Sequence, residues 1–116
     1  MSKIKIAAYG TLREGFYNHD RFNDVKKVDQ KTLMGFQLWD FGPYPYAIKT
    51  NNPEDQMVVD ILEVSSDAER SITRMEEGAG YYTQMITVDD SPCIIYLYKG
   101  IVNNTRQIKS GDYTQK

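Results

Sequence analysis

The stretch Met57–Gly78, "MVVDILEVSSDAERSITRMEEG", joins a strand pattern to a helix pattern and so decides the fold class. Its first part, "MVVDILEV", is a nearly continuous apolar run rich in β-branched residues, which is typical of a buried strand. Ser65 and Ser66 are N-cap candidates, and Glu69 stands three residues after Ser66 as a capping-box partner. The stretch therefore predicts a strand at 57–64 followed directly by a helix.

The predicted helix turns only one of its two adjacent glutamates toward the core. Ala68, Ile72 and Met75 are spaced at i, i+4 and i+7, so they mark the core-facing stripe. At about 100° per residue, Glu76 falls on the edge of this stripe and Glu77 on the opposite face. We therefore expect Glu76 at the core margin and Glu77 in solvent.

The end of this helix should raise the pKa of the inward acid. Gly78 suits the position just past the last helical residue, which puts Glu76 in the last turn, near the negative end of the helix dipole. Partial burial and that field both disfavour the charged carboxylate. A raised pKa suits a general base that works near neutral pH. The same position equally suits a structural carboxyl that is hydrogen-bonded to a tyrosine or a backbone amide.

The rest of the chain adds short strands separated by turn residues. The last two expected strands are joined by "DDSP" and predict a hairpin, and the polar tail has room for one more short strand. Including the strand at 57–64, we expect five to seven strands and one clear helix in a single α+β domain spanning residues 1–116. The other expected strands are 3–9, 32–41, 46–49, 82–88 and 93–98.

Composition excludes several classes of function. The chain has 116 residues, 41% of them hydrophobic and 26% charged, which is ordinary for one globular domain. A net charge of -2 with interspersed signs argues against a nucleic-acid or membrane-surface partner. Cys93 is the only cysteine, so no intrachain disulfide is expected. With no signal-peptide pattern at the N-terminus, we expect a cytoplasmic location; the oligomeric state is left open.

A second candidate element lies at the end of the first expected strand, in "AYGTLREGFYNH" (8–19). Gly10 stands where the backbone must turn sharply or approach another group closely. If a helical turn begins at Leu12, the backbone amides of residues 10–13 point outward together and form a small anion site. An ordinary strand-to-turn junction fits the same residues.

Five blocks carry a resemblance to a known family: "YGTLREGFYNH" (9–19), "PYPYAI" (43–48), "VDILEV" (59–64), "ITRMEEGAGYY" (72–82) and "SGDY" (110–113). In this order they resemble the γ-glutamylcyclotransferase-like family, which also contains γ-glutamylamine cyclotransferases and AIG2-like proteins. The resemblance implies a small mixed β-barrel with flanking helices. It also implies an enzyme that converts a γ-glutamyl amine or amino acid to 5-oxoproline and the free amine, without a cofactor or a metal.

The resemblance also implies roles for particular residues. The family's substrate loop corresponds to Tyr9, Gly10, Thr11 and Leu12, and its catalytic acid corresponds to Glu76.

Tyr81 and Tyr82 are candidates for lining the same site, and either would also suit core packing. Thr73 departs from the family pattern, which usually has Asp at this position, and the identity of the leaving amine stays open. Two alternatives also stay open: a module that binds a small ligand in the same pocket without turnover, and an enzyme that removes a γ-glutamyl group from a larger molecule.

Overall fold

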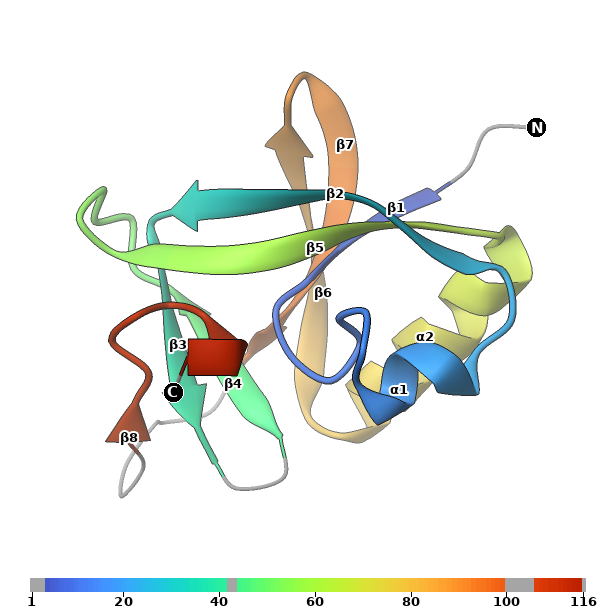
Figure 1. Cartoon of the computed structure of the whole chain (residues 1–116), viewed down its shortest axis with the longest axis horizontal. Helices are drawn as coiled ribbons and strands as arrows, with labels where there is room; N and C mark the ends of the chain where they lie inside the picture. Colours follow the sequence, from blue (N-terminus) through green and yellow to red (C-terminus); the bar gives the residue numbers. More distant parts are fainter. Residues whose placement is uncertain (1–3, 42–43, 100–105, 116) are drawn as a thin grey trace.

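The structure is a computed structural model, and it describes residues 4–41, 44–99 and 106–115. Within these ranges the chain forms eight strands, two α-helices and one 3₁₀ turn (Figure 1). In chain order they are β1 (Ile4–Ala8), α1 (Tyr17–Arg21), β2 (Val25–Met34), β3 (Phe36–Asp40), β4 (Pro45–Lys49), β5 (Gln56–Val64), α2 (Ser66–Gly78), β6 (Tyr81–Val88), β7 (Ser91–Tyr98), β8 (Arg106–Gln107) and η1 (Tyr113–Gln115).

The strands form two sheets of mixed direction. The larger sheet has the order β2-β5-β1-β7-β6, and the smaller has the order β4-β3-β8. β1 lies at the centre of the larger sheet, antiparallel to β5 and parallel to β7. The predicted α+β class is confirmed. A closed barrel is not, because in the described residues both sheets are open, with β2 and β6 at the edges of the larger one.

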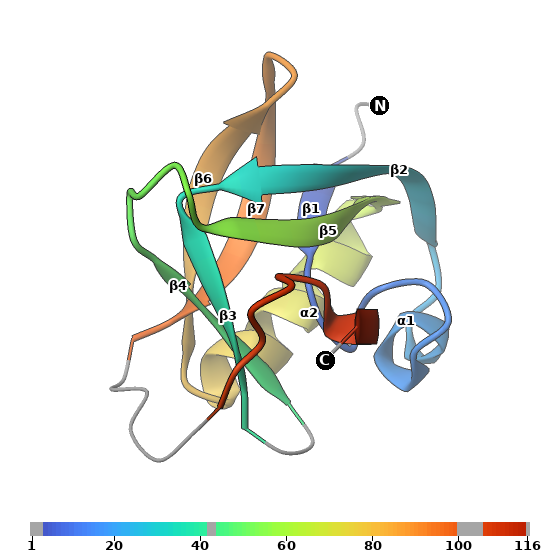
Figure 2. The same ribbon diagram turned by 60° about the vertical axis from the view of Figure 1, so that its left-hand side comes forward.

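The larger sheet is buried on both faces, which explains the continuous apolar run of β5. Val59 and Ile61 belong to a core cluster shared with Leu38 of the smaller sheet. Leu62 belongs to a second cluster, which also contains Ile72 of α2. Because alternate residues of a strand point to opposite faces, one strand serves both cores. In Figure 1, α1 and α2 lie on the right of the molecule, on the other side from β3, β4 and β8. In the turned view of Figure 2, the end of α2 passes behind β3 and β4, and α1 lies to the right.

The N-terminal cap of α2 is one of the two serines that the sequence offered as candidates. Ser65 is the N-cap, and its side-chain oxygen accepts a hydrogen bond from the Ala68 amide at 3.1 Å. Ser66 is the first helical residue, so the capping box that we expected between Ser66 and Glu69 is wrong. Glu69 Oε2 instead accepts a hydrogen bond from the Thr73 hydroxyl at 2.6 Å.

The C-terminal end of α2 also lies slightly beyond the prediction. Gly78 is the last helical residue, and Ala79 follows it as the C-cap, with φ -93°. Gly78, which we placed just past the helix, is therefore still helical, and Gly80 takes up the left-handed conformation, with φ +99°. The chain therefore reaches one residue further before it turns into β6.

Two loops show how local sequence sets the strand boundaries. The expected strand 32–41 is divided at Gly35, whose φ of +86° sends the chain from one sheet into the other. The β6–β7 hairpin is present as predicted and turns at Asp89 and Asp90, with φ +50° and +64°. Two consecutive positive φ values are typical of a tight hairpin turn.

Candidate functional site

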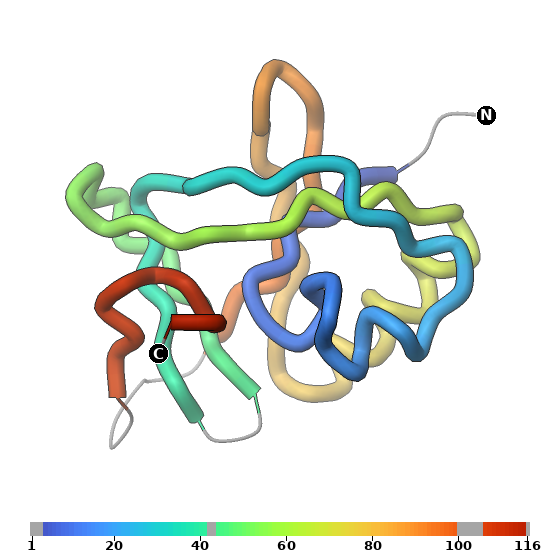
Figure 3. The backbone as a smooth tube through the Cα atoms, viewed as in Figure 1, coloured from blue at the N-terminus to red at the C-terminus, as the bar shows by residue number. Residues whose placement is uncertain are grey.

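A cavity of about 160 Å³ lies where the loop after β1 meets the end of α2. Seen as a tube in Figure 3, the chain doubles back after β1 and then runs into α1, beside α2. Such a volume is smaller than the roughly 300–1,000 Å³ typical of drug-sized ligand sites, so it suits a ligand the size of one amino acid. The residues lining it are Ala7, Ala8, Tyr9, Gly10, Thr11, Leu12, Asn18, Arg21, Tyr44, Pro45, Met75, Glu76, Ala79, Tyr81 and Tyr96.

The structure brings six of the seven residues proposed from the sequence to this cavity. They are Tyr9, Gly10, Thr11, Leu12, Glu76 and Tyr81. Tyr82 is not among the residues that line it; its half-buried side chain packs against the core cluster shared by the two sheets. Consecutive strand residues point to opposite faces, so Tyr81 and Tyr82 could not both face the cavity. Tyr82 is therefore a packing residue.

Glu76 is half-buried in the last turn of α2 and lines the cavity, whereas Glu77 is exposed. Burial raises the pKa of Glu76 from its ordinary value of 4.5 to about 7. Glu77 accepts a hydrogen bond from the Thr83 hydroxyl at 3.2 Å, outside the cavity. The helix thus presents to the cavity an acid that can both accept and release a proton near neutral pH.

The loop after β1 is held tightly against β4. A Cβ atom placed on Gly10 would lie 2.4 Å from Cγ of Pro45, so only glycine fits there without a shift. The Gly10 carbonyl oxygen accepts a hydrogen bond from the Arg13 amide at 2.9 Å, which closes a turn. The need for close approach that the sequence suggested at Gly10 is thus met by Pro45.

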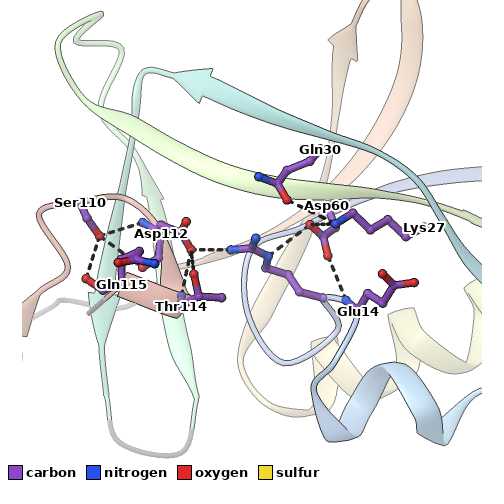
Figure 4. Close-up of polar contacts among 9 residues, drawn as sticks. Glu14, Lys27, Gln30, Asp60, Ser110, Asp112, Thr114 and Gln115 are labelled. Carbon is purple, nitrogen blue, oxygen red and sulfur yellow. Dashed lines mark hydrogen bonds and ion pairs between the residues drawn. The ribbon is translucent and has the colours of Figure 1, made fainter.

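A buried carboxylate anchors the same loop from behind (Figure 4). Asp60 of β5 is 1% exposed. Its Oδ2 accepts the Glu14 amide at 2.9 Å, and its Oδ1 lies 3.3 Å from Arg13 Nε and 3.4 Å from Lys27 Nζ. Arg13 is also buried and donates to Asp112 of the C-terminal segment at 2.8 Å. This cluster ties the loop to the central sheet and to the tail.

Two of the tyrosines that line the cavity donate their hydroxyl hydrogens to backbone carbonyls. Tyr9 donates to the Tyr96 carbonyl oxygen at 2.5 Å, and Tyr81 donates to the Pro45 carbonyl oxygen at 2.7 Å. Burial, with a further contribution from Glu76, raises the pKa of Tyr9, Tyr81 and Tyr96 above the ordinary value. These side chains therefore stay neutral, and they shape the wall of the cavity and do not supply charge.

The contribution of α1 to the cavity was not predicted from the sequence. The Asn18 side chain is buried and donates to the Thr11 hydroxyl at 2.8 Å. His19 Nδ1 hydrogen-bonds to the Leu12 carbonyl oxygen at 2.9 Å. Asn18 and Arg21 both line the cavity. Their i, i+3 spacing on a short helix was the signal that could have placed them on one face.

Within the ranges 4–41, 44–99 and 106–115, no cluster of three or more His, Cys, Asp or Glu side chains is arranged to hold a metal ion. Cys93 is buried in β7, and burial raises the pKa of its thiol to about 11, which makes it a poor nucleophile. No helix in those ranges is long and apolar enough to cross a membrane.

The fold and this site define a small α+β protein with an inward acid facing a glycine-containing loop. The sequence profile of the family described as "Gamma-glutamyl cyclotransferase, AIG2-like" matches residues 6–115, and the chain belongs to this family. The chain is 29% identical over 112 residues, 97% of its length, to a Pyrococcus horikoshii protein named provisionally as a gamma-glutamylcyclotransferase, and covers 92% of that protein. It is 26% identical over 113 residues to the gamma-glutamylcyclotransferase family protein YtfP of Escherichia coli, with 97% and 98% of the two chains covered.

The three-dimensional comparison agrees with the sequence comparison. A crystal structure of the Pyrococcus horikoshii protein superimposes with a TM-score of 0.80 at 28% identity. The match covers 95% of this chain and 89% of the other. Membership of the family supports a γ-glutamylcyclotransferase-like activity at the level of the family.

Proposed function

We propose that this protein converts a γ-glutamyl amine or γ-glutamyl amino acid to 5-oxoproline and the free amine. In this reaction the substrate's α-nitrogen attacks its own γ-carbonyl carbon. A carbon–nitrogen bond forms within the ring, and the bond to the leaving nitrogen breaks. Nucleophile and electrophile belong to one molecule, so the protein's part is to fold the substrate, move one proton and stabilise the oxyanion.

Each part of the site takes one of these tasks. Glu76 accepts one proton from the substrate's α-ammonium group and returns it to the departing nitrogen. The attacking nitrogen loses its second proton to water as the lactam forms, and the released amine takes one up from water, so the proton count balances. The backbone amides of the Gly10–Leu12 turn hold either the α-carboxylate or the oxyanion. Tyr9 and Tyr81 form the wall against which the glutamyl chain folds.

One observation carries this proposal: a half-buried carboxyl with a pKa of about 7 lines the same cavity as the Tyr9–Leu12 loop. At neutral pH such a group is present in both protonation states, and both are needed in one catalytic cycle. The family to which the chain belongs supports the same chemistry.

The test is the release of 5-oxoproline from γ-glutamyl dipeptides and γ-glutamylamines by the wild type, Glu76→Gln and Glu77→Gln. We expect Glu76→Gln to lose activity by roughly 10²- to 10⁴-fold, the range of a general base. Glu77→Gln should stay close to wild type, because that side chain is exposed outside the cavity. Equal losses in the two variants would contradict the assignment of the base.

The binding-module alternative predicts a different use of Glu76. A site that holds an ammonium ion gains most from a carboxylate that is ionised at neutral pH, and thus from a low pKa. Burial has the opposite effect on Glu76, which favours the proton-transfer role. No release of 5-oxoproline by the wild type from any γ-glutamyl compound would favour the binding module. Release only from a γ-glutamylated macromolecule would favour an enzyme that removes a γ-glutamyl group from a larger molecule.

A further inference from the structure

Arg21 is a cation at the mouth of the cavity that the proposed reaction does not use. It is the last residue of α1 and is exposed, yet it lines the cavity together with Glu76. These two are the charged residues among the described side chains that line it. A cation and an acid in one small cavity suit a ligand that carries charges of both signs.

The described contacts of Arg21 orient its guanidinium without neutralising it. Arg21 Nη1 lies 3.4 Å from Asn18 Oδ1 and 3.6 Å from Met75 Sδ, and its Cζ lies 5.8 Å from the centroid of the Phe22 ring. All three partners are neutral. Among the residues that the structure describes, no carboxylate forms an ion pair with Arg21. The guanidinium therefore retains its capacity to bind a carboxylate of a ligand.

The helix that carries Arg21 is fastened to the substrate loop. Asn18 bonds to the Thr11 hydroxyl and His19 to the Leu12 carbonyl oxygen, so two of the five residues of α1 contact the loop. The position of Arg21 is thus set relative to the loop and to α2, which provides Met75 and Glu76. A fixed cation discriminates between ligands better than one on a free side chain.

Size and exposure indicate which part of a substrate reaches Arg21. A cavity of about 160 Å³ accommodates the reacting glutamyl unit next to the half-buried Glu76. The leaving group must then extend toward the mouth, where Arg21 is exposed. A leaving amino acid carries its own carboxylate two bonds from the nitrogen that departs, whereas a simple amine has none.

We infer that Arg21 binds the carboxylate of the leaving group and so selects γ-glutamyl amino acids over γ-glutamylamines. This inference rests on the proposed function for the reaction itself. It names a specificity-determining residue outside the Tyr9–Leu12 loop and Glu76.

The experiment uses two dipeptides that differ in one charge: γ-L-glutamyl-L-alanine and γ-L-glutamyl-L-alaninamide. Wild type should prefer the acid. Arg21→Gln should lower kcat/KM for the acid by roughly 5- to 50-fold and leave kcat/KM for the amide nearly unchanged. This range lies between the effect of an exposed ion pair and that of a buried charge-assisted hydrogen bond. Arg21→Lys should restore part of the preference. Arg74→Gln, which removes an exposed charge of α2 outside the cavity, is the matched control and should behave like wild type.

Binding measurements separate this inference from the proposed function. Glu76→Gln is titrated by calorimetry with both dipeptides, alone and combined with Arg21→Gln. If Glu76→Gln binds the acid more tightly than the amide and the double variant does not, the role of Arg21 is supported. This holds even if wild type releases no 5-oxoproline, because that outcome would contradict only the proposed reaction. Equal loss of both dipeptides in Arg21→Gln, no preference in wild type, or no binding of either dipeptide would overturn the inference.

Discussion

Replacing Glu76 by glutamine should stabilise the folded protein, and the gain should appear only toward neutral and alkaline pH. Burial raises the pKa of Glu76 from 4.5 to about 7, so the folded state binds this proton more tightly than the unfolded chain does. The protonated carboxyl therefore contributes its full share to the free energy of unfolding below about pH 4.5. This contribution is lost as the pH rises to about 7 and the carboxyl ionises inside the folded protein. Glutamine does not ionise, so the variant does not lose it.

The pKa shift sets the size of the effect. Each tenfold change in proton affinity corresponds to about 1.4 kcal/mol, so a rise from 4.5 to about 7 sets an upper limit of about 3 kcal/mol. Because the side chain is only half-buried, solvent should reduce this value, and we expect a gain of about 2 kcal/mol at pH 8. At pH 4.5 the acid is neutral in the folded state, and the difference should nearly vanish.

Urea denaturation at pH 4.5 and pH 8 measures this difference directly, without any assumption about activity. The control is Glu77→Gln, one residue away on the exposed face of α2, which should show no comparable pH-dependent gain. A free energy difference between wild type and Glu76→Gln that is the same at both pH values would refute the reasoning. So would an equal pH-dependent gain in the Glu77 variant.

Three further predictions concern the same site. The kcat/KM for 5-oxoproline release should rise with pH through a midpoint near pH 7 and level off above it, because the base must be ionised to act; a midpoint near pH 4.5 would mean that the pKa of the base is that of a carboxyl group in water. Gly10→Ala should lower both activity and the free energy of unfolding, the latter by about 1–3 kcal/mol, because the new methyl group would lie 2.4 Å from Pro45. The control Gly78→Ala meets no atom within 4 Å and should be neutral or stabilising in a melting experiment. Asp60→Asn should lower the free energy of unfolding in urea by about 1–3 kcal/mol, because it removes the buried carboxylate that pairs with Arg13 and Lys27, while Arg13 keeps its ion pair with Asp112; a loss below 1 kcal/mol would contradict the anchoring role.

The features that the sequence predicted well depend on short spacings. The phase of α2 follows from residues within three turns, which is why the sequence alone distinguishes Glu76 from Glu77. The β6–β7 hairpin likewise depends on adjacent residues. The choice between Ser65 and Ser66 as the N-cap stayed open, and the C-terminal end was misplaced, because two serines, or the glycines 78 and 80, are chemically alike and only the path of the chain chooses between them.

The features that the sequence did not predict depend on contacts between distant segments. Arg13 lies 47 residues from Asp60 and 99 from Asp112, so no local pattern connects them. The start of β2 was missed because "VKKVDQK" is highly charged. It forms an edge strand whose lysines face solvent or ion-pair, and edge strands commonly carry such residues. Tyr82 was assigned to the site by its proximity in sequence, although the alternation of strand side chains separates it from Tyr81.

Two sets of polar contacts hold the segments that the proposed reaction must place precisely. The loop after β1 is held by the Asp60 cluster. On the other side of the cavity, the Thr73 hydroxyl of α2 lies 2.7 Å from the Tyr96 hydroxyl of β7. The carbonyl oxygen of Tyr96 also accepts a hydrogen bond from the Tyr9 hydroxyl. One residue of the central sheet thus holds both the loop and the helix in place. An intramolecular aminolysis requires such relative placement more than it requires additional reactive groups. One carboxyl then suffices for the proton transfer, because the surroundings that bury it also bring its pKa close to neutral.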